Sequence, residues 1–253
     1  NLILSHCCGV GAELSPEVVR LVMATKLLSL GAGASGVRWE TLSLLDAMLD
    51  RRFTAPLADE GPDAFGTLDE VEAAEGPKAL VTTSSAPKHF SNGLDTPWMA
   101  TAESGDVVAY VDSCFRLVHR IMLLGAPTAA AVTGHAFGLG AVVVLAHDQA
   151  VMREDRGFWN LPEVHLAMNF PPGLMNVARS RIAASELARA VVVGHRYTGP
   201  DAAAAGIVDE ALPLDRLTDA AITRVASLAV TAGDNLATIK RQLYPLVAEL
   251  TEG

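Results

Sequence analysis

From residue 51 onward, short runs of apolar and β-branched residues alternate with longer segments whose apolar positions recur at helical spacing. The short runs predict strands at residues 79–83, 128–133, 149–152 and 207–209. The longer segments predict helices at residues 67–75, 106–123, 173–181, 185–193, 199–205, 217–232 and 234–250, and one from the glycine turn at 134–140 to residue 147. This alternation favours an α/β fold in which helices cover parallel strands.

The first 50 residues have a different pattern. Ser15-Pro16-Glu17 is typical of a helix start and predicts a helix to about Leu30, and a second helix is predicted at about residues 39–49. Residues 31–36 match the GxGxxG pattern of dinucleotide-binding loops, but that pattern requires a preceding strand, so we interpret them as a flexible linker. We therefore divide the chain into an atypical, helical or flexible segment at 1–50, a core at 51–210 and a C-terminal helical region at 211–253.

Composition narrows the possible function classes. The chain has 253 residues, of which 50% are hydrophobic, and a formal net charge of −10 without a basic cluster, which disfavours a nucleic-acid binder. The cysteines show neither a disulfide framework nor metal-ligand spacing, so we expect no metal site. Residues 121–147 lack charged side chains, but glycines and a proline interrupt them, so a buried strand, a glycine turn and a helix explain them better than a membrane span.

Three segments come in an order along the chain that suits one active site. In residues 88–95, Gly93 permits an unusual turn that can leave the N–H of Leu94 pointing outward. Residues 134–140 lead from a strand into a helix, and free N–H groups at a helix N-terminus suit an oxyanion. The third segment carries Glu163 among apolar neighbours. Together they predict a carboxylate that faces two backbone donors.

The order and spacing of these motifs resemble the crotonase, or enoyl-CoA hydratase/isomerase, superfamily over residues 51–250. The stretches that carry the resemblance are 90–95, 147–148, 152–157 and 206–209. The resemblance is greatest to the monofunctional Δ3,Δ2-enoyl-CoA isomerases of the plant type. It implies a ββα spiral followed by a C-terminal helical region that mediates trimerisation.

The resemblance also implies partners and site residues. The expected substrate is an acyl-CoA thioester with no separate cofactor, the expected assembly is a homotrimer or a dimer of trimers, and a peroxisome is favoured over a mitochondrion. Glu163 is implied as the catalytic base, and the backbone N–H groups of Leu94 and Leu139 as the oxyanion hole. The implied substrate-binding residues are Ser91, Asn92, Gly93, Asp95, Gly138, Trp159 and Phe170.

The chemistry follows from these groups. Removing a proton α to a thioester builds negative charge on the carbonyl oxygen, which two preorganised N–H donors stabilise. Glu163 would take the C2 proton of a 3-enoyl-CoA and return it at C4. Hydratases of the family carry a second Glu where Val142 stands, and dienoyl-CoA isomerases and related hydrolases carry an Asp near residues 170–172, which here read Phe-Pro-Pro. A Δ3,Δ2-enoyl-CoA isomerase with one carboxylate is therefore favoured.

Other interpretations of the same residues remain. Glu163 can cap a helix, Asp95 can fix its own loop, and Trp159 and Phe170 can belong to the core. An enoyl-CoA hydratase is the first rival function. A catalytically silent acyl-CoA-binding or partner subunit is the second, because the first 50 residues do not show the β-hairpin with which family members open.

Overall fold

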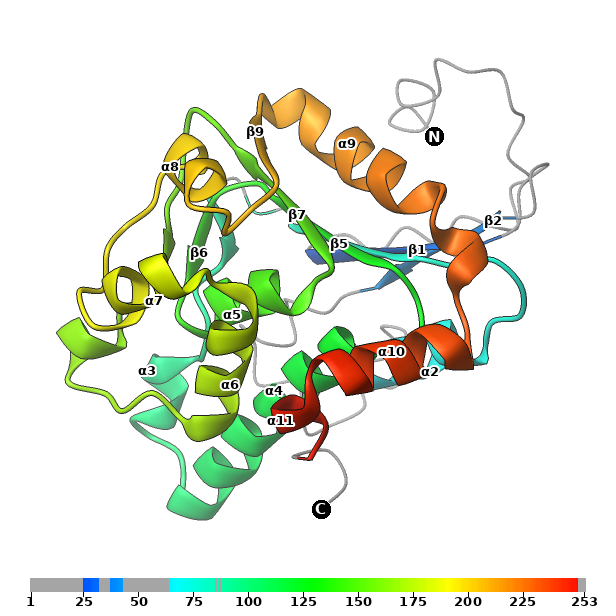
Figure 1. Ribbon diagram of the computed structural model, residues 1–253. Helices are drawn as coiled ribbons and strands as arrows, with labels where there is room; N and C mark the ends of the chain where they lie inside the picture. The colour runs from blue at the N-terminus through cyan, green and yellow to red at the C-terminus, as the bar shows by residue number, and fades with distance from the viewer. Residues whose placement is uncertain (1–24, 32–36, 43–63, 85, 87, 250–253) are drawn as a thin grey trace.

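The computed structural model describes residues 25–31, 37–42, 64–84, 86 and 88–249 (Figure 1). A six-stranded sheet has the order β2-β1-β3-β5-β7-β9, and a three-stranded sheet has the order β4-β6-β8. The strands of the larger sheet are β1 (Thr25–Gly31), β2 (Val37–Leu42), β3 (Leu80–Ser84), β5 (Thr128–Val132), β7 (Gln149–Arg153) and β9 (Glu210–Leu212). Those of the smaller sheet are β4 (His89–Ser91), β6 (His135–Phe137) and β8 (Trp159–Asn160). Strands β3, β5, β7 and β9 pair in parallel, as do β4, β6 and β8, which confirms the α/β prediction.

The helices follow between and after the strands. They are α2 (Ala64–Ala73), α3 (Thr96–Met99), α4 (Ser104–Leu123), α5 (Leu139–Ala146), α6 (Pro172–Arg181), α7 (Ala184–Val191), α8 (Gly199–Ala204), α9 (Leu214–Ala226), α10 (Asp234–Leu243) and α11 (Pro245–Ala248), with 3₁₀ turns η2 (Glu163–Leu166) and η3 (Ala229–Thr231). Helix α9 lies against β5 and β7 on one face of the larger sheet (Figure 1).

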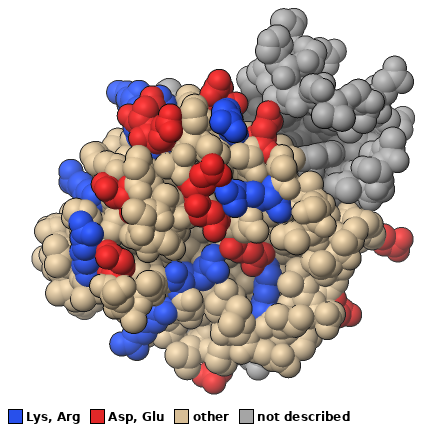
Figure 2. All heavy atoms as spheres, turned by 45° about the horizontal axis from the view of Figure 1, so that its top comes forward, with Lys and Arg blue, Asp and Glu red and all other residues tan. Residues whose placement is uncertain are grey.

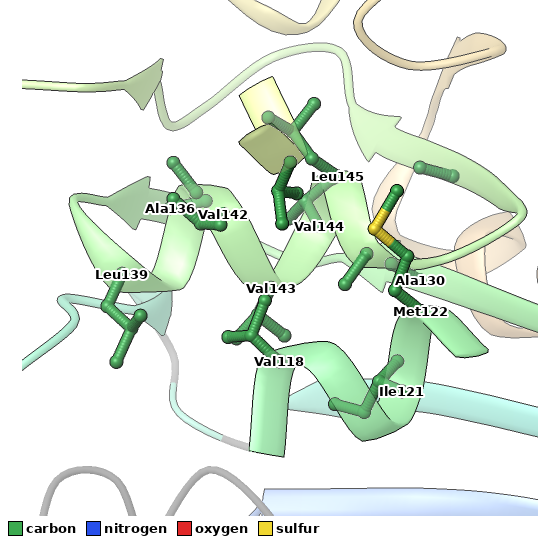
Figure 3. Packing of buried hydrophobic residues seen from close by; sticks show 14 of the residues in the cluster. Val118, Ile121, Met122, Ala130, Ala136, Leu139, Val142, Val143, Val144 and Leu145 are labelled. Carbon is green, nitrogen blue, oxygen red and sulfur yellow. The ribbon is translucent and has the colours of Figure 1, made fainter. Parts of the chain in front are cut away.

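The alternation of side chains along β5 explains why this sheet is covered on both faces. Ala129 and Ala131 belong to the core cluster under α9, whereas Ala130 and Val132 belong to the cluster formed with α4 and α5. Every residue of α5 is buried, as expected for a helix that is apolar on all sides. Figure 3 shows the second cluster, where Val118 of α4 meets Val143 of α5.

The helices predicted before residue 50 are wrong where the structure describes them. Residues 25–31 and 37–42 form an antiparallel hairpin, and β1 also pairs antiparallel with β3. The opening hairpin that the sequence did not reveal is therefore present. Pairing with β3 selects the extended conformation, which local helix signals cannot anticipate. The rest of those two predicted helices lies outside the described residues.

Most predicted elements after residue 64 are confirmed, and the differences concern short elements and the ends of longer ones. Strands β4, β6 and β8 and helix α3 are missed, because elements of two to four residues give no periodic signal. The strand predicted at 207–209 begins instead at Glu210, and Ile207 and Val208 are buried as loop residues. The helix predicted at 217–232 ends at Ala226, and the 3₁₀ turn η3 follows after a short break. The last helix breaks at Tyr244, because the residue before a proline is disfavoured in the helical conformation.

The structure can be compared with two interpretations that the sequence disfavours, a membrane span and a nucleic-acid binder. Within the described ranges no helix combines the length and the apolar character needed to cross a bilayer, and residues 121–147 are divided among α4, β5, β6 and α5. On the face that Figure 2 presents, acidic and basic side chains are interspersed, and no broad basic surface is seen there.

Candidate active site

Glu163 is the first residue of the 3₁₀ turn η2 and follows β8 through Leu161 and Pro162. Its Oε1 would lie 3.5 Å from a Cβ added to Gly138, so the carboxyl group sits against the glycine turn that precedes α5. Its Oε2 is buried and finds no hydrogen-bond partner among the described residues. Burial raises the pKa of this carboxyl group, because the charged form loses water, and a hydrogen bond from its own backbone offsets only part of that effect. A carboxyl group in this state is suited to exchange a proton with a bound molecule.

The two turns expected to carry the backbone donors are pressed together. Gly93 has a φ of 86°, which glycine adopts without strain, and a Cβ at this position would lie 2.9 Å from the Leu139 nitrogen. At the residue after Leu139, a Cβ on Gly140 would lie 2.7 Å from the Ser91 Cβ, and closer still to the Ser91 carbonyl oxygen. A side chain at either glycine would push the two turns apart. Because glycine has no side chain, the two turns can touch.

In the first turn, hydrogen bonds occupy the amides on both sides of Leu94. The Gly93 N–H donates to Ser91 Oγ at 3.2 Å, and the Asp95 N–H donates to Tyr110 Oη at 3.0 Å. The Leu94 N–H between them has no acceptor in the part of the chain that the structure describes. The amides on both sides of Leu94 therefore donate hydrogen bonds within the protein, while the Leu94 N–H is available to a ligand.

The second turn leaves a donor of the same kind. The Gly138 N–H donates to the Asn160 carbonyl oxygen at 3.0 Å, whereas the Leu139 N–H, at the first position of α5, has no acceptor among the described residues. Free N–H groups at the start of a helix carry partial positive charge. Because Gly93 approaches the Leu139 nitrogen and Glu163 approaches Gly138, the structure brings both donors and the carboxyl group into one neighbourhood.

This arrangement can remove a proton from carbon while stabilising the oxygen that gains charge. The carboxyl group accepts the proton, and the two N–H groups can bind an enolate oxygen. In the described residues no group of three or more His, Cys, Asp or Glu side chains could hold a metal ion.

The other predicted site residues divide into several roles. Ser91 is 0% exposed and supports the first turn through its Oγ. Asp95 accepts a hydrogen bond from the Trp98 N–H at the start of α3, so its carboxylate fixes the loop. Asn92 is exposed, and Phe170 is half-buried against the core. No hydrogen bond joins any of these four side chains to Glu163 among the described residues.

Trp159 corrects an expectation. It was expected in substrate binding, but it is 0% exposed, its Nε1 donates to the Ala141 carbonyl oxygen at 3.0 Å, and its ring meets Tyr197 edge-on. A side chain without accessible surface packs the core instead of contacting a ligand. Leu139 is likewise buried with 4% exposure, and Val142 is fully buried in the same cluster (Figure 3).

Two supporting residues are missed by the sequence reasoning. Tyr110 reaches Asp95 from α4, and Asn160 holds Gly138 through its carbonyl oxygen while its side chain donates to the backbone oxygens of residues 194–195. A lone tyrosine in an amphipathic helix and a lone asparagine in a strand carry no sequence signal for these contacts.

Comparison with known proteins gives a consistent result. The profile of the enoyl-CoA hydratase/isomerase family matches residues 49–250, and the profile of aromatic amino acid lyases matches residues 1–61. The peroxisomal enoyl-CoA delta isomerase 2 of Arabidopsis thaliana is 30% identical over 198 residues, which are 73% of this chain and 82% of that protein.

Solved structures agree in fold. The human mitochondrial Δ3-Δ2-enoyl-CoA isomerase matches with a TM-score of 0.67 and 21% identity, covering 74% of this chain and 73% of that one. An enoyl-CoA hydratase from Bacillus anthracis matches with a TM-score of 0.61 and 20% identity, covering 74% and 79%. The crotonase fold expected from the sequence is thereby confirmed, and the chain belongs to the enoyl-CoA hydratase/isomerase family.

Proposed function

We propose that this protein is a Δ3,Δ2-enoyl-CoA isomerase that uses Glu163 as its single proton shuttle. The observation that carries the proposal is the buried Oε2 of Glu163 beside a glycine turn whose next amide is that of Leu139; neither group has a hydrogen-bond partner among the described residues. The isomerase relative from Arabidopsis thaliana supports the same reaction class.

The proposed reaction needs no redox step. The Glu163 carboxylate takes a proton from C2 of a 3-enoyl-CoA, and the electron pair of that C–H bond moves onto the thioester oxygen. The N–H groups of Leu94 and Leu139 donate hydrogen bonds to the resulting dienolate. The protonated Glu163 then returns the proton to C4, the double bond moves to C2–C3, and the carboxylate is restored. The raised pKa of Glu163 favours this use as base and then as acid.

Hydration of a 2-enoyl-CoA is the weaker alternative. It requires a group that orients a water molecule together with Glu163. Val142, at the position where hydratases carry a second Glu, is an apolar side chain with 0% exposure. A catalytically silent binding protein is the remaining rival, and activity measurements separate it from both enzymes.

We also propose that the protein assembles as a homotrimer or a dimer of trimers through residues 211–253. Ile239, Leu243 and Leu246 on α10 and α11 are 49%, 63% and 51% exposed, and burying such apolar surface would favour association. The name of the Arabidopsis relative supports a peroxisomal location. Light scattering after size-exclusion chromatography tests the assembly.

The activity test compares wild type, Glu163→Gln and the control Glu154→Gln, which changes an exposed carboxylate. Each protein receives 3-enoyl-CoA, and the conjugated product is followed by absorbance. We expect Glu163→Gln to lose about 10²–10⁴-fold in rate and the control to match wild type. Equal turnover by wild type and Glu163→Gln rejects the base. Absence of turnover in all three favours the silent protein, and efficient conversion of 2-enoyl-CoA to 3-hydroxyacyl-CoA favours the hydratase.

A further inference from the structure

The turn that carries Leu94 is anchored by a residue from another element. Tyr110 lies in the second turn of α4, 15 residues away, and its Oη accepts the Asp95 N–H at 3.0 Å. The Thr96 N–H in turn donates to the Leu94 carbonyl oxygen at 2.9 Å. Both polar groups of the peptide between Leu94 and Asp95 are therefore fixed.

Tyr110 is itself held firmly. It is 3% exposed, and its ring meets the Trp98 ring of α3 edge-on, with 5.2 Å between the centroids. The buried Cys114 thiol lies near its hydroxyl group, one turn later in α4. The hydroxyl group thus joins the rigid helix α4 to the turn.

The hydrogen bond to Tyr110 matters because the turn can rotate at Gly93. Gly93 at φ 86° precedes Leu94, and a glycine can rotate its peptide plane more readily than any other residue. Among the described residues, the Gly93 N–H donates to the neighbouring Ser91 hydroxyl, which belongs to the same turn. Tyr110 supplies a hydrogen bond that ties the turn to helix α4.

We propose that Tyr110 is a positioning residue, whose hydroxyl group fixes the peptide after Leu94 and so aims the Leu94 N–H at the substrate oxygen. The catalytic part of this proposal rests on the proposed isomerase function. The hydroxyl group touches neither substrate nor Glu163. It acts through the backbone of Asp95, so its removal leaves the base and the Leu139 donor in place.

The test compares Tyr110→Phe with the matched control Tyr244→Phe. The first variant keeps the ring packing and loses only the hydroxyl group. The control also removes a buried tyrosine hydroxyl. Tyr244 lies between α10 and α11, and its hydroxyl group accepts a hydrogen bond from Arg181 of α6 at 3.1 Å. Two readouts are used, namely amide hydrogen exchange at Asp95, which needs no activity, and kcat and KM with 3-enoyl-CoA.

For Tyr110→Phe we expect faster exchange at the Asp95 amide, and a fall in kcat of about 10-fold with KM nearly unchanged. A misaimed donor loses part of the about 10²–10³-fold that one oxyanion-hole donor contributes. Tyr244→Phe should change neither readout. Unchanged exchange at Asp95 overturns the proposal, and so does faster exchange with wild-type kcat. If wild type does not isomerise 3-enoyl-CoA, the proposed function fails, and the exchange measurement alone decides whether Tyr110 holds the turn.

Discussion

Gly140→Ala tests whether contact between the two glycine turns sets the catalytic rate. A Cβ on Gly140 would lie 2.7 Å from the Ser91 Cβ. Carbon atoms in ordinary contact are about 3.5–4.0 Å apart, so the backbones must separate by about 1 Å. The two turns carry the Leu94 and Leu139 N–H groups, and that separation widens the gap between the two donors.

The expected cost falls on the reaction more than on folding. A displacement of about 1 Å at a catalytic group can lower the rate about 10²-fold, so we expect kcat/KM of Gly140→Ala to fall by about that factor. Crowding destabilises a core by about 1–3 kcal/mol, but alanine is favoured over glycine by about 1 kcal/mol inside a helix such as α5. The variant should therefore remain folded at room temperature.

The assay measures turnover of 3-enoyl-CoA per folded protein, with the folded fraction taken from circular dichroism. Gly105→Ala is the matched control, because Gly105 also lies in the first turn of a helix and an added Cβ there meets nothing within 4 Å. It should keep full activity. Wild-type kcat/KM in a folded Gly140→Ala protein would refute the link between turn contact and rate.

Two further predictions concern pH. His147 is fully buried between Thr82 Oγ1 and the Val143 carbonyl oxygen, and burial lowers its pKa from 6.5 to about 4. The unfolded chain therefore binds this proton at a higher pH than the folded one, and the free energy of unfolding should fall by about 3 kcal/mol as the pH drops from 6.5 to about 4. Urea unfolding across that range measures it, and the lowered pKa of His119 adds in the same direction, so a flat curve contradicts the prediction. For catalysis, Glu163 must be ionised to accept the proton, and because burial raises its pKa, the acid limb of kcat/KM should have its midpoint above 4.5. A midpoint at or below that value in a pH–rate profile would contradict the buried carboxyl group.

The comparison of sequence and structure separates local from distant determinants. The helix at 106–123 and the strands at 79–83, 128–133 and 149–152 were predictable, because each carries its own periodicity or apolar run. The opening hairpin was not, since residues 25–31 become a strand through pairing with β3, more than 45 positions along the chain. Helix signals near Ser15 gave no information about that partner.

The same division holds within the candidate site. The sequence by itself determined which groups are available: one carboxyl group at Glu163 in an apolar setting, and glycines at 93, 138 and 140 that permit unusual backbone turns. Only the tertiary structure decided that Gly93 meets the Leu139 nitrogen and that Tyr110 holds Asp95. Such contacts join segments on different strands and helices, and their distances depend on sheet pairing and core packing, which no local pattern encodes.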